Sequence, residues 1–511
     1  MSLEPSEDAF LRAYDDGRSQ LVWTRLIDDV ETPVSAYLKI AEGRPYAFLF
    51  ESVEGGAYRG RYSIIAMKPD LVWRARGDVA EIAEGADIAA GRFTAQKGGA
   101  LDSLRDLVAA TRLPLPDGLP PMATGIFGAI GYDMVRLAEH LPNVNPDPLG
   151  LPDAVMIRPS IVAVFDSIGH EIVIVTSARP AAGVSAKDAW AAAQARLEAT
   201  IADLGRPLAH RPPQARTEPP NFESPVSRAD YHRIVARAKD YIVAGDIFQV
   251  VPSHRFRAPF ALDPFALYRS LRRTNPSPFL FYLNLEGIQL AGSSPEILVR
   301  LRDGKITIRP IAGTRPRGKS PAEDAALERE LLDDPKERAE HLMLLDLGRN
   351  DVGRVAMLRA EGSNLAAEET KGPSVRVTDS FFIERYSHVM HIVSNVEGDA
   401  PDGLDPVDVL MAALPAGTLS GAPKVRAMEI IDELETEKRG IGYAGAVGYF
   451  GADGSVDTCI VLRTALFKDG TMYVQAGGGV VADSDPDAEY EETVHKSMAL
   501  RRAAEEAWRF G

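Results

Sequence analysis

Glutamates at helical spacing occur in two segments that lie far apart in the chain. DDPKERAEHLMLLDLGRND carries Glu337 and Glu340, and DPDAEYEETVHK carries Glu489, Glu492 and Lys496. Residues three or four apart share one face of a helix. Carboxylates gathered from two such faces repel one another unless a cation lies among them, and Mg2+ prefers oxygen ligands. The spacing therefore predicts two helices that line one Mg2+-dependent site.

A simpler structural role is the alternative for each of these glutamates. Asp334, Pro335 and Glu337 fit the N-cap, N1 and N3 positions of a helix start, where Glu337 would cap. Acids in the first turn after Pro486 also complement the helix dipole. Capping or solvated glutamates are the commoner case, so the pairing alone leaves both interpretations open.

The composition narrows the class of protein. A chain of 511 residues predicts roughly two to four domains. The net charge of −16, without a long basic run, argues against nucleic acid as a partner. The acidic start MSLEPSEDAF does not resemble a signal peptide, and no apolar run approaches the length of a membrane span. We therefore expect a cytoplasmic protein without a membrane partner. The single cysteine, Cys459, lies in an apolar run and is interpreted as a buried strand residue.

The positioning elements mix strands and helices. Proline-rich sequence at 205–226 predicts a linker between residues 1–204 and 227–511. Ser185 and Ser227 each precede a helical pattern, with an aspartate three residues later. Asp303-Gly304 and Asp469-Gly470 predict hairpin turns and hence antiparallel pairing. The expected fold class is α+β, with large antiparallel sheets packed as a β-sandwich and helices covering the outer faces. Strands are expected at 46–53, 61–67, 160–167, 170–177, 279–285, 287–293, 297–311, 388–398, 445–451, 458–467 and 471–481.

Several longer motifs occur in a fixed order. They are PIAGTRPRG, KERAEHLMLLDLGRND, YSHVMHIVSNVEG, LPAGTLSGAPKVRAMEII, GYAGAVGYF, DTCIVLRTA, QAGGGVVADSDP and EYEETVHK. In these motifs the chain resembles the chorismate-utilising enzymes, and among them most closely the anthranilate synthase component I group. The resemblance covers nearly the whole chain and is strongest from Asp246 to Lys496. It implies that residues 227–511 form the chorismate-binding catalytic domain and that residues 1–204 form a tryptophan-binding regulatory region.

The resemblance also implies the roles of individual residues. Mg2+ would be held by Glu340 and Glu492, with Glu337 and Glu489 nearby, and it would bind the ring carboxylate of chorismate. His391 and Thr418 would be catalytic. Arg463 reads independently as a cation in an apolar strand, which calls for an anionic partner. The family pattern is usually GAG where this chain has Gly477, Gly478 and Gly479, which taken alone fit a bulge or turn. The substrate-binding residues implied are Gly313, Thr314, Tyr443, Arg463, Gly477, Gly478, Gly479 and Lys496.

His391 has a structural alternative as well. Alone, it would be interpreted as a satisfied histidine on a half-buried strand, whereas the resemblance implies a general acid or base. His388, three residues earlier, points to the opposite face of a strand, so at most one of the two faces inward. The family motif favours His391.

Two positions separate the reactions within the family. Aminodeoxychorismate synthases carry a lysine where this chain has Ala312, and isochorismate and salicylate synthases carry one where it has Gln249. Neither residue can supply an amine or a base, which suits ammonia as the nucleophile. The implied reaction is that of anthranilate synthase: chorismate and ammonia give anthranilate and pyruvate, as the first step of tryptophan biosynthesis. Another chorismate aminase, or a catalytically silent relative, is the alternative.

The partners follow from the same comparison. Cys459 lacks the downstream His-x-Glu pair of a class I amidotransferase, so a separate glutamine amidotransferase subunit would supply ammonia, in a heterotetramer. L-Tryptophan would inhibit from an effector site, with Tyr449 nearby. LFES, which contains the first two effector residues, could alternatively be an edge strand followed by a turn. The effector residues implied are Glu51, Ser52, Pro278, Phe279 and Leu280.

Overall fold

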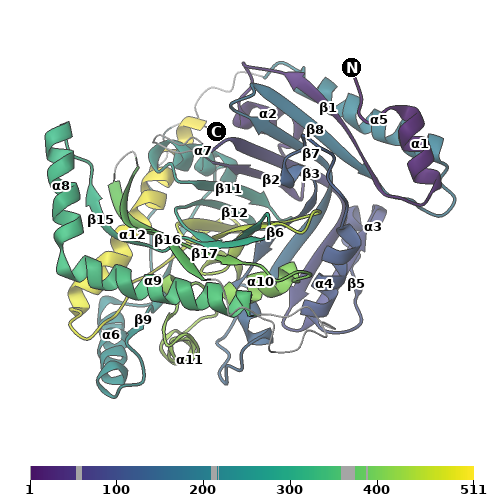
Figure 1. Ribbon diagram of the computed structural model, residues 1–511. Coiled ribbons are helices and arrows are strands. Elements are labelled where there is room, and N and C mark those ends of the chain that lie inside the picture. Colours follow the sequence, from purple (N-terminus) through teal and green to yellow (C-terminus); the bar gives the residue numbers. More distant parts are fainter. Residues whose placement is uncertain are drawn as a thin grey trace.

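The computed structural model describes residues 2–52, 60–208, 216, 218–357, 375–386 and 389–510. Its strands form one large curled, barrel-like sheet, and helices cover the outside (Figure 1). Only β9 (Gln249–Val250) and β18 (Gly421–Ala422), among the described strands, form a separate two-stranded sheet. No helix within the described ranges is long and apolar enough to cross a membrane.

The first part of the chain supplies one half of the sheet. Its central strands, β3 and β7, pair over most of their lengths, and β8, β6, β2 and β4 extend the sheet from them. The strands are β1 (Gln20–Ile27), β2 (Ala47–Glu51), β3 (Tyr62–Arg76), β4 (Val79–Glu84), β5 (Thr94–Ala95), β6 (Gly125–Ile130), β7 (Ala154–Asp166) and β8 (Glu171–Ala178).

The second part of the chain supplies the other half. Two antiparallel pairings connect the halves: β2 with β11, and β6 with β19. Strands from both sides of the Pro-rich segment therefore share one sheet. The strands are β10 (Ser253–Pro259), β11 (Phe279–Asn284), β12 (Gln289–Ser294), β13 (Ile297–Arg302), β14 (Lys305–Ile308), β15 (Ile311–Pro316), β16 (Arg376–Arg385), β17 (Val389–Asp399), β19 (Ala446–Gly451), β20 (Val456–Ile460), β21 (Thr464–Lys468) and β22 (Thr471–Gly477).

Helices lie on both outer faces of the sheet. The α-helices are α1 (Glu7–Asp15), α2 (Pro33–Ile40), α3 (Ala86–Ala89), α4 (Ala100–Thr111), α5 (Ala186–Leu204), α6 (Arg228–Val243), α7 (Pro264–Thr274), α8 (Pro321–Asp333), α9 (Pro335–Ala356), α10 (Pro406–Ala413), α11 (Lys424–Leu434) and α12 (Pro486–Glu506). The 3-10 helices are η1 (Pro121–Ala123), η2 (Tyr132–Leu137), η3 (Gly417–Leu419), η4 (Gly440–Gly442) and η5 (Ala507–Phe510). Figure 1 shows α8, α9 and α12 at one side of the molecule and α1 and α5 at the opposite end.

The strands are apolar on both faces because each face is covered. Along β3, Ile64 and Ala66 point into the core enclosed by the sheet, whereas Ile65 and Met67 pack under the helices. This alternation follows from the two-residue period of a strand. A second outer core lies beneath α4 and α10. The enclosed core accounts for the sandwich-like pattern in the sequence.

Most of the predicted elements are confirmed. Ser185 and Ser227 cap α5 and α6, and Asp334 caps α9. Both predicted hairpin turns have an aspartate and a glycine at positive φ, as expected of type I′ turns. The α+β class and the antiparallel pairing are also observed.

Two predictions about the sheet differ from the structure. Packing of separate sheets as a β-sandwich is not confirmed, because pairings such as β2–β11 and β6–β19 join both halves into one sheet. The run 458–467 is two strands, β20 and β21, with a bend that contains Arg463 between them. Val53, the end of one predicted strand, and His388 lie outside the described residues, as does part of the predicted linker.

Candidate active site

The helices α9 and α12 bring the predicted carboxylates to one place. Burial raises the pKa of Glu340, and the charges of Glu337 and Glu492 raise it further, so the two helices approach each other here. Glu337 does not bond back to the helix start as a cap; it forms an ion pair with Arg315 at 3.1 Å. Glu492 pairs with Lys496 at 2.7 Å. Glu340 therefore lies within electrostatic reach of Glu337 on its own helix and of Glu492 on α12.

The carboxylates fit a bound cation. Burial raises the pKa of Glu489; a 2.7 Å bond from the Ser484 hydroxyl opposes that rise, and the charge of Glu492 adds to it. The second carboxylate oxygen of Glu489, Oε2, is buried and accepts no hydrogen bond from any described residue. A cation would reduce the repulsion between the carboxylates and would give Glu489 Oε2 a partner. Within the described ranges, no group of three or more His, Cys, Asp or Glu side chains is arranged to hold a metal ion.

Gly477 ends β22, and Gly478 and Gly479 follow it. This glycine segment, 477–479, lies close to neighbouring backbone. A Cβ on Gly477 would lie 2.6 Å from the Pro252 carbonyl oxygen, so only glycine fits. At Gly478, where the family pattern has alanine, a Cβ would lie 2.9 Å from Glu489 Oε2. Tyr443 is buried beside this segment, and its hydroxyl oxygen lies 2.9 Å from the position that a Cβ on Gly477 would take. Lys496 donates to the Gly477 carbonyl at 3.1 Å.

Arg463 lies in the bend between β20 and β21. Its φ of 47° is unusual for a residue with a side chain and marks local strain, a feature common at binding sites. Burial lowers the pKa of its guanidinium, and Tyr386 and Glu296 oppose that shift. Among the residues that the structure describes, none forms an ion pair with Arg463. A half-buried cation without an ion-pair partner among the described residues is suited to an anionic ligand.

His391, on β17, is buried against β15. Its Nδ1 lies 2.9 Å from the Gly313 carbonyl oxygen and 3.1 Å from the Thr314 hydroxyl. A carbonyl can only accept, so Nδ1 carries the proton and Nε2 is left as a proton acceptor. Burial lowers the pKa of His391 to about 4, against the hydrogen bond to Gly313. At neutral pH this imidazole is uncharged and is suited to act as a base.

Glu296, at the start of β13, is a residue that the sequence reasoning missed. Its buried carboxylate accepts a hydrogen bond from the Thr418 hydroxyl at 3.2 Å. Burial raises the pKa of Glu296 to about 8, although Thr418, Arg463 and Lys496 all lower it. A carboxyl that stays protonated at pH 7 can act as an acid. The signal was present in GSSPEILVR, where one acid stands between two apolar strand segments.

Glu296 and Thr418 also line a cavity. The cavity therefore provides a space next to the protonated carboxyl and the Thr418 hydroxyl. The remaining lining residues are Ile297, Leu298, Ile308, Pro310, Leu344, Leu347, Gly348, Asp351, Ala413, Ala416 and Gly417.

The two positions that separate the family's reactions both lie at this site. Ala312 is buried on β15 opposite Ile392, next to His391. Gln249 is buried on β9, where its Nε2 would lie 2.4 Å from a Cβ built on Gly479. Its Oε1 is buried and has no hydrogen-bond partner among the described residues. Neither position supplies a basic amine.

The predicted effector residues meet at the pairing of β2 with β11. Glu51 lies opposite Leu280 in this register. The Glu51 carboxylate is bonded to the Tyr268 hydroxyl and to Arg272, both on α7, so it links the strand to that helix. Ser52, Pro278 and Phe279 are half-buried beside it. Tyr449 is buried and bonded to Arg302 at 3.1 Å, and it packs on Phe127.

Comparison with known proteins identifies the family. The family of chorismate binding enzymes matches residues 68–502. The chain is 56% identical over 506 residues to anthranilate synthase component 1 of Cereibacter sphaeroides, covering 99% of this chain and 98% of that protein. It is 46% identical to anthranilate synthase component 1 of Pseudomonas aeruginosa, covering 98% of each.

Solved structures agree with this result. Anthranilate synthase component I from Streptococcus pneumoniae superimposes with a TM-score of 0.74 at 34% identity, covering 93% of this chain and 98% of that one. The menaquinone-specific isochorismate synthase of Escherichia coli, at 18% identity and a TM-score of 0.68, shares the fold over 98% of both chains. With a family match over most of its length and full-length relatives, this chain belongs to the chorismate-binding enzymes.

Proposed function

We propose that the chain is the aminase subunit of an anthranilate synthase, which converts chorismate and ammonia to anthranilate and pyruvate. The observation that carries the chemistry is the pair Glu296 and His391. Burial pushes their pKa values in opposite directions, to about 8 and about 4, and the Arg463 charge acts on both. Such a pair supplies one acid and one base at neutral pH. The names of the full-length relatives support the choice of substrate and product.

The carboxylates of chorismate would be bound by Arg463, Lys496 and the glycine segment 477–479, which offer two cations and backbone N–H donors. Lys496 is paired with Glu492 at 2.7 Å in this structure. Glu340 and Glu492, with Glu337 and Glu489 nearby, would hold a Mg2+ ion, which supplies positive charge to the ring carboxylate. Binding substrate would also draw Lys496 away from Glu492.

The first step is addition of ammonia with loss of water. Ammonia forms a bond to ring C2 as the double bonds shift and the C4–O bond breaks. Glu296 gives its proton to the departing hydroxyl, which leaves as water, and the new ammonium loses a proton to restore the balance. Thr418 holds the Glu296 carboxyl at 3.2 Å for this transfer. Because Glu296 is neutral at pH 7, it can donate without help from a second acid.

The second step eliminates pyruvate. Nε2 of His391 accepts the C2 proton, the ring becomes aromatic, and the enolpyruvyl C–O bond breaks with its electrons on pyruvate. Pyruvate takes a proton as it forms, which returns the site to its starting state. The hydrogen bond from Nδ1 to Gly313 orients the ring and stabilises the imidazolium that forms transiently.

Ammonia is favoured as the nucleophile because Ala312 and Gln249 replace the lysines of related reactions. A glutamine amidotransferase subunit would supply it, in a cytoplasmic heterotetramer, and L-tryptophan would inhibit at the β2–β11 pairing.

The test is purified chain with chorismate, ammonium and Mg2+, followed by fluorescence and by separation of products. Blue-fluorescent anthranilate is the expected result. A non-aromatic amino product would indicate another chorismate aminase, and unchanged chorismate would refute the enzyme assignment. Glutamine alone should give no product.

A further inference from the structure

A fully buried ion pair lies directly after helix α11. Arg439 donates to both carboxylate oxygens of Glu435 at 2.6–3.2 Å. The residues are only 3% and 7% exposed. Removing two charges from water costs more than the attraction between them usually returns, so such a pair is weak evidence for a role in stability. Its contacts point to another role.

The remaining N–H groups of Arg439 bind two backbone carbonyls far apart in the chain. One is Leu419, 2.7 Å away, which follows Thr418 in η3. The other is Val251, also 2.7 Å away, which follows β9 and Gln249. The Val251 N–H in turn donates to the Ser420 carbonyl at 2.9 Å. The guanidinium thus fixes the Thr418 turn against the segment that carries Gln249.

Glu435 extends this network, through Ser253, to the glycine segment 477–479. It accepts from the Ser253 N–H at 2.7 Å and from the Ser253 hydroxyl at 2.8 Å. Ser253 pairs with Gly477 in the β10–β22 register. Arg439 also lies over the ring of Tyr443, 5.3 Å from its centre, and the Tyr443 hydroxyl oxygen lies 2.9 Å from the position that a Cβ on Gly477 would take. The ion pair therefore contacts two segments of the proposed chorismate site directly, and it reaches the third, 477–479, through Ser253 and Tyr443.

We propose that Glu435 and Arg439 are positioning residues of the chorismate site. This inference rests on the proposed function. The pair sets the spacing between the Thr418 turn, the segment 249–253 and the glycine segment 477–479. Arginine is required because its planar fork of five donors can hold one carboxylate and two carbonyls at once. Lysine has a single nitrogen and cannot reach all three in fixed directions.

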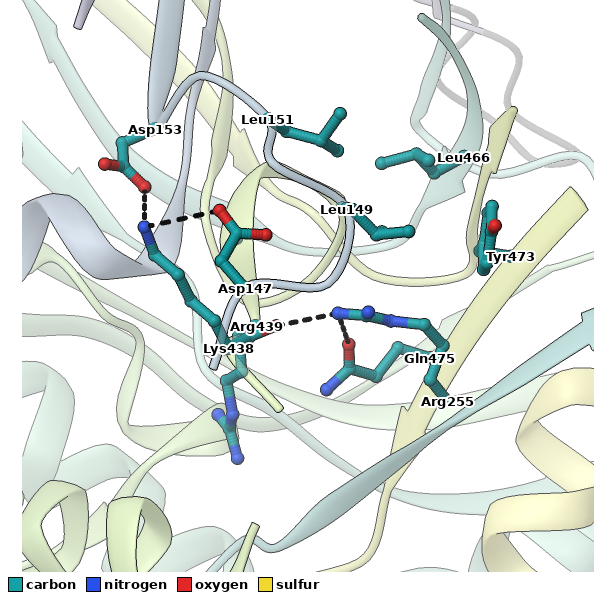
Figure 2. Close-up of a pocket in the computed structure, with 12 residues that line it drawn as sticks. Asp147, Leu149, Leu151, Asp153, Arg255, Lys438, Arg439, Leu466, Tyr473 and Gln475 are labelled. Carbon is teal, nitrogen blue, oxygen red and sulfur yellow. Dashed lines mark hydrogen bonds and ion pairs between the residues drawn. The ribbon is translucent and has the colours of Figure 1, made fainter. Parts of the chain in front are cut away.

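On another side, Arg439 borders a second pocket, and its side chain points away from the other lining residues (Figure 2). The other cations of this pocket are already paired: Arg255 with Glu437 at 2.9 Å, and Lys438 with Asp153 at 2.5 Å. Neither of them is free to replace the Arg439 guanidinium. The remaining lining residues are Asp147, Leu149, Leu151, Gly440, Gly442, Leu466, Tyr473 and Gln475.

The experiment compares Arg439→Lys and Glu435→Gln with Arg136→Lys as the matched control. Arg136 is also a multidentate arginine, but it holds two acids and one carbonyl, namely Asp133, Asp432 and Asn143, and no substrate-binding segment. It is linked to the Arg439 segment only through Asp133, which accepts from the Gly440 N–H. We expect kcat/KM for chorismate to fall by about 10²-fold in Arg439→Lys, with KM raised, because displaced groups no longer meet the substrate. Arg136→Lys should keep the KM of the original protein. A merely less stable enzyme would lose active molecules without a change in KM.

Hydrogen exchange of backbone amides tests the same inference without turnover. In Arg439→Lys and Glu435→Gln, exchange should accelerate at Val251, Ser253 and Gly478, and stay unchanged in the β1–β8 pairing. The proposal is overturned if exchange and KM match those of Arg136→Lys. If the original protein makes no anthranilate, the proposed function fails separately. The exchange result then still decides whether the pair spaces these segments. If Arg439→Lys does not fold, Glu435→Gln gives both measurements.

Discussion

At the scale of single residues, the site depends on groups whose charge the protein environment changes. Glu296 and His391 are both buried, and burial favours the neutral form of each. The same physical effect therefore produces a proton donor from a carboxyl group and a proton acceptor from an imidazole. Burial is the largest cause of both pKa shifts. The charge of Arg463 opposes the rise at Glu296 and adds to the fall at His391.

Glu296→Gln should remove the proposed acid. We expect kcat to fall by about 10²- to 10³-fold. With free ammonia held constant, the original protein should lose activity as pH rises through about 8, where Glu296 loses its proton. Because the folded pKa is raised, this carboxyl also destabilises the fold as pH rises from about 4.5 to 8. Melting temperature should therefore fall less over that range in Glu296→Gln, and equal slopes would contradict the assignment.

His391→Asn should slow the second step more than the first. Asparagine can still bond near Gly313 but cannot accept the ring proton. We expect chorismate to be consumed while anthranilate formation drops by about 10²-fold, so that an amino intermediate accumulates. Chromatography of timed samples measures both. Equal slowing of chorismate loss and anthranilate formation would place His391 outside the elimination step.

At the scale of elements, the helices α9 and α12 supply the carboxylates. The N-cap residue of each helix fixes where that helix begins. Asp334 and Asp485 both accept backbone N–H groups at the helix starts, and a proline follows each. These caps leave the glutamates free for other contacts: the charges of Glu337 and Glu492 act on Glu340, and the charge of Glu492 acts on Glu489. The repulsion between them is a cost that a bound cation removes.

Glu492→Ala or Glu340→Ala should abolish most Mg2+-dependent turnover with little loss of stability. Removing one carboxylate weakens cation binding but also relieves repulsion, which offsets the lost contacts. Binding of Mn2+ as a probe, followed by electron paramagnetic resonance, should weaken in parallel. Glu491→Ala is the control, because Glu491 lies on the same helix but pairs with Arg228. Normal Mg2+-dependent turnover of Glu492→Ala would refute the two-helix site.

At the scale of the whole molecule, the curled sheet connects the proposed effector site with the proposed chorismate site. Glu51 on β2 is bonded to Tyr268 and Arg272 of α7, and α7 packs against α12. A ligand seated at β2–β11 therefore contacts an element connected to the helix of Glu492. A ligand that shifts this arrangement alters chorismate binding by linkage.

Ser52→Phe should abolish inhibition by L-tryptophan and leave catalysis nearly intact. The added ring fills space beside Ser52, whereas the catalytic groups lie on other elements. Anthranilate formation against tryptophan concentration is the measurement, with Ser52→Ala as the control that adds no bulk. The same inhibition curve in Ser52→Phe and the original protein would place the effector site elsewhere.

The sequence by itself determined the local elements and the family. Helix caps, Asp-Gly hairpins and glutamates at helical spacing depend on neighbours within a few residues, so they are readable from the chain. Most of the site residues followed from the ordered motifs. The bend at Arg463 was missed because the run 458–467 is continuously apolar, and nothing local marks the positive φ.

Only the tertiary structure decided which groups are charged and which segments are held together. Glu296 becomes an acid because distant strands and η3 bury it. The single sheet arises from pairings such as β2 with β11, which join residues more than two hundred positions apart. The network of Arg439 likewise depends on Val251 and Leu419 meeting at one point. Burial and long-range contact are properties of the folded chain, so local sequence patterns cannot specify them.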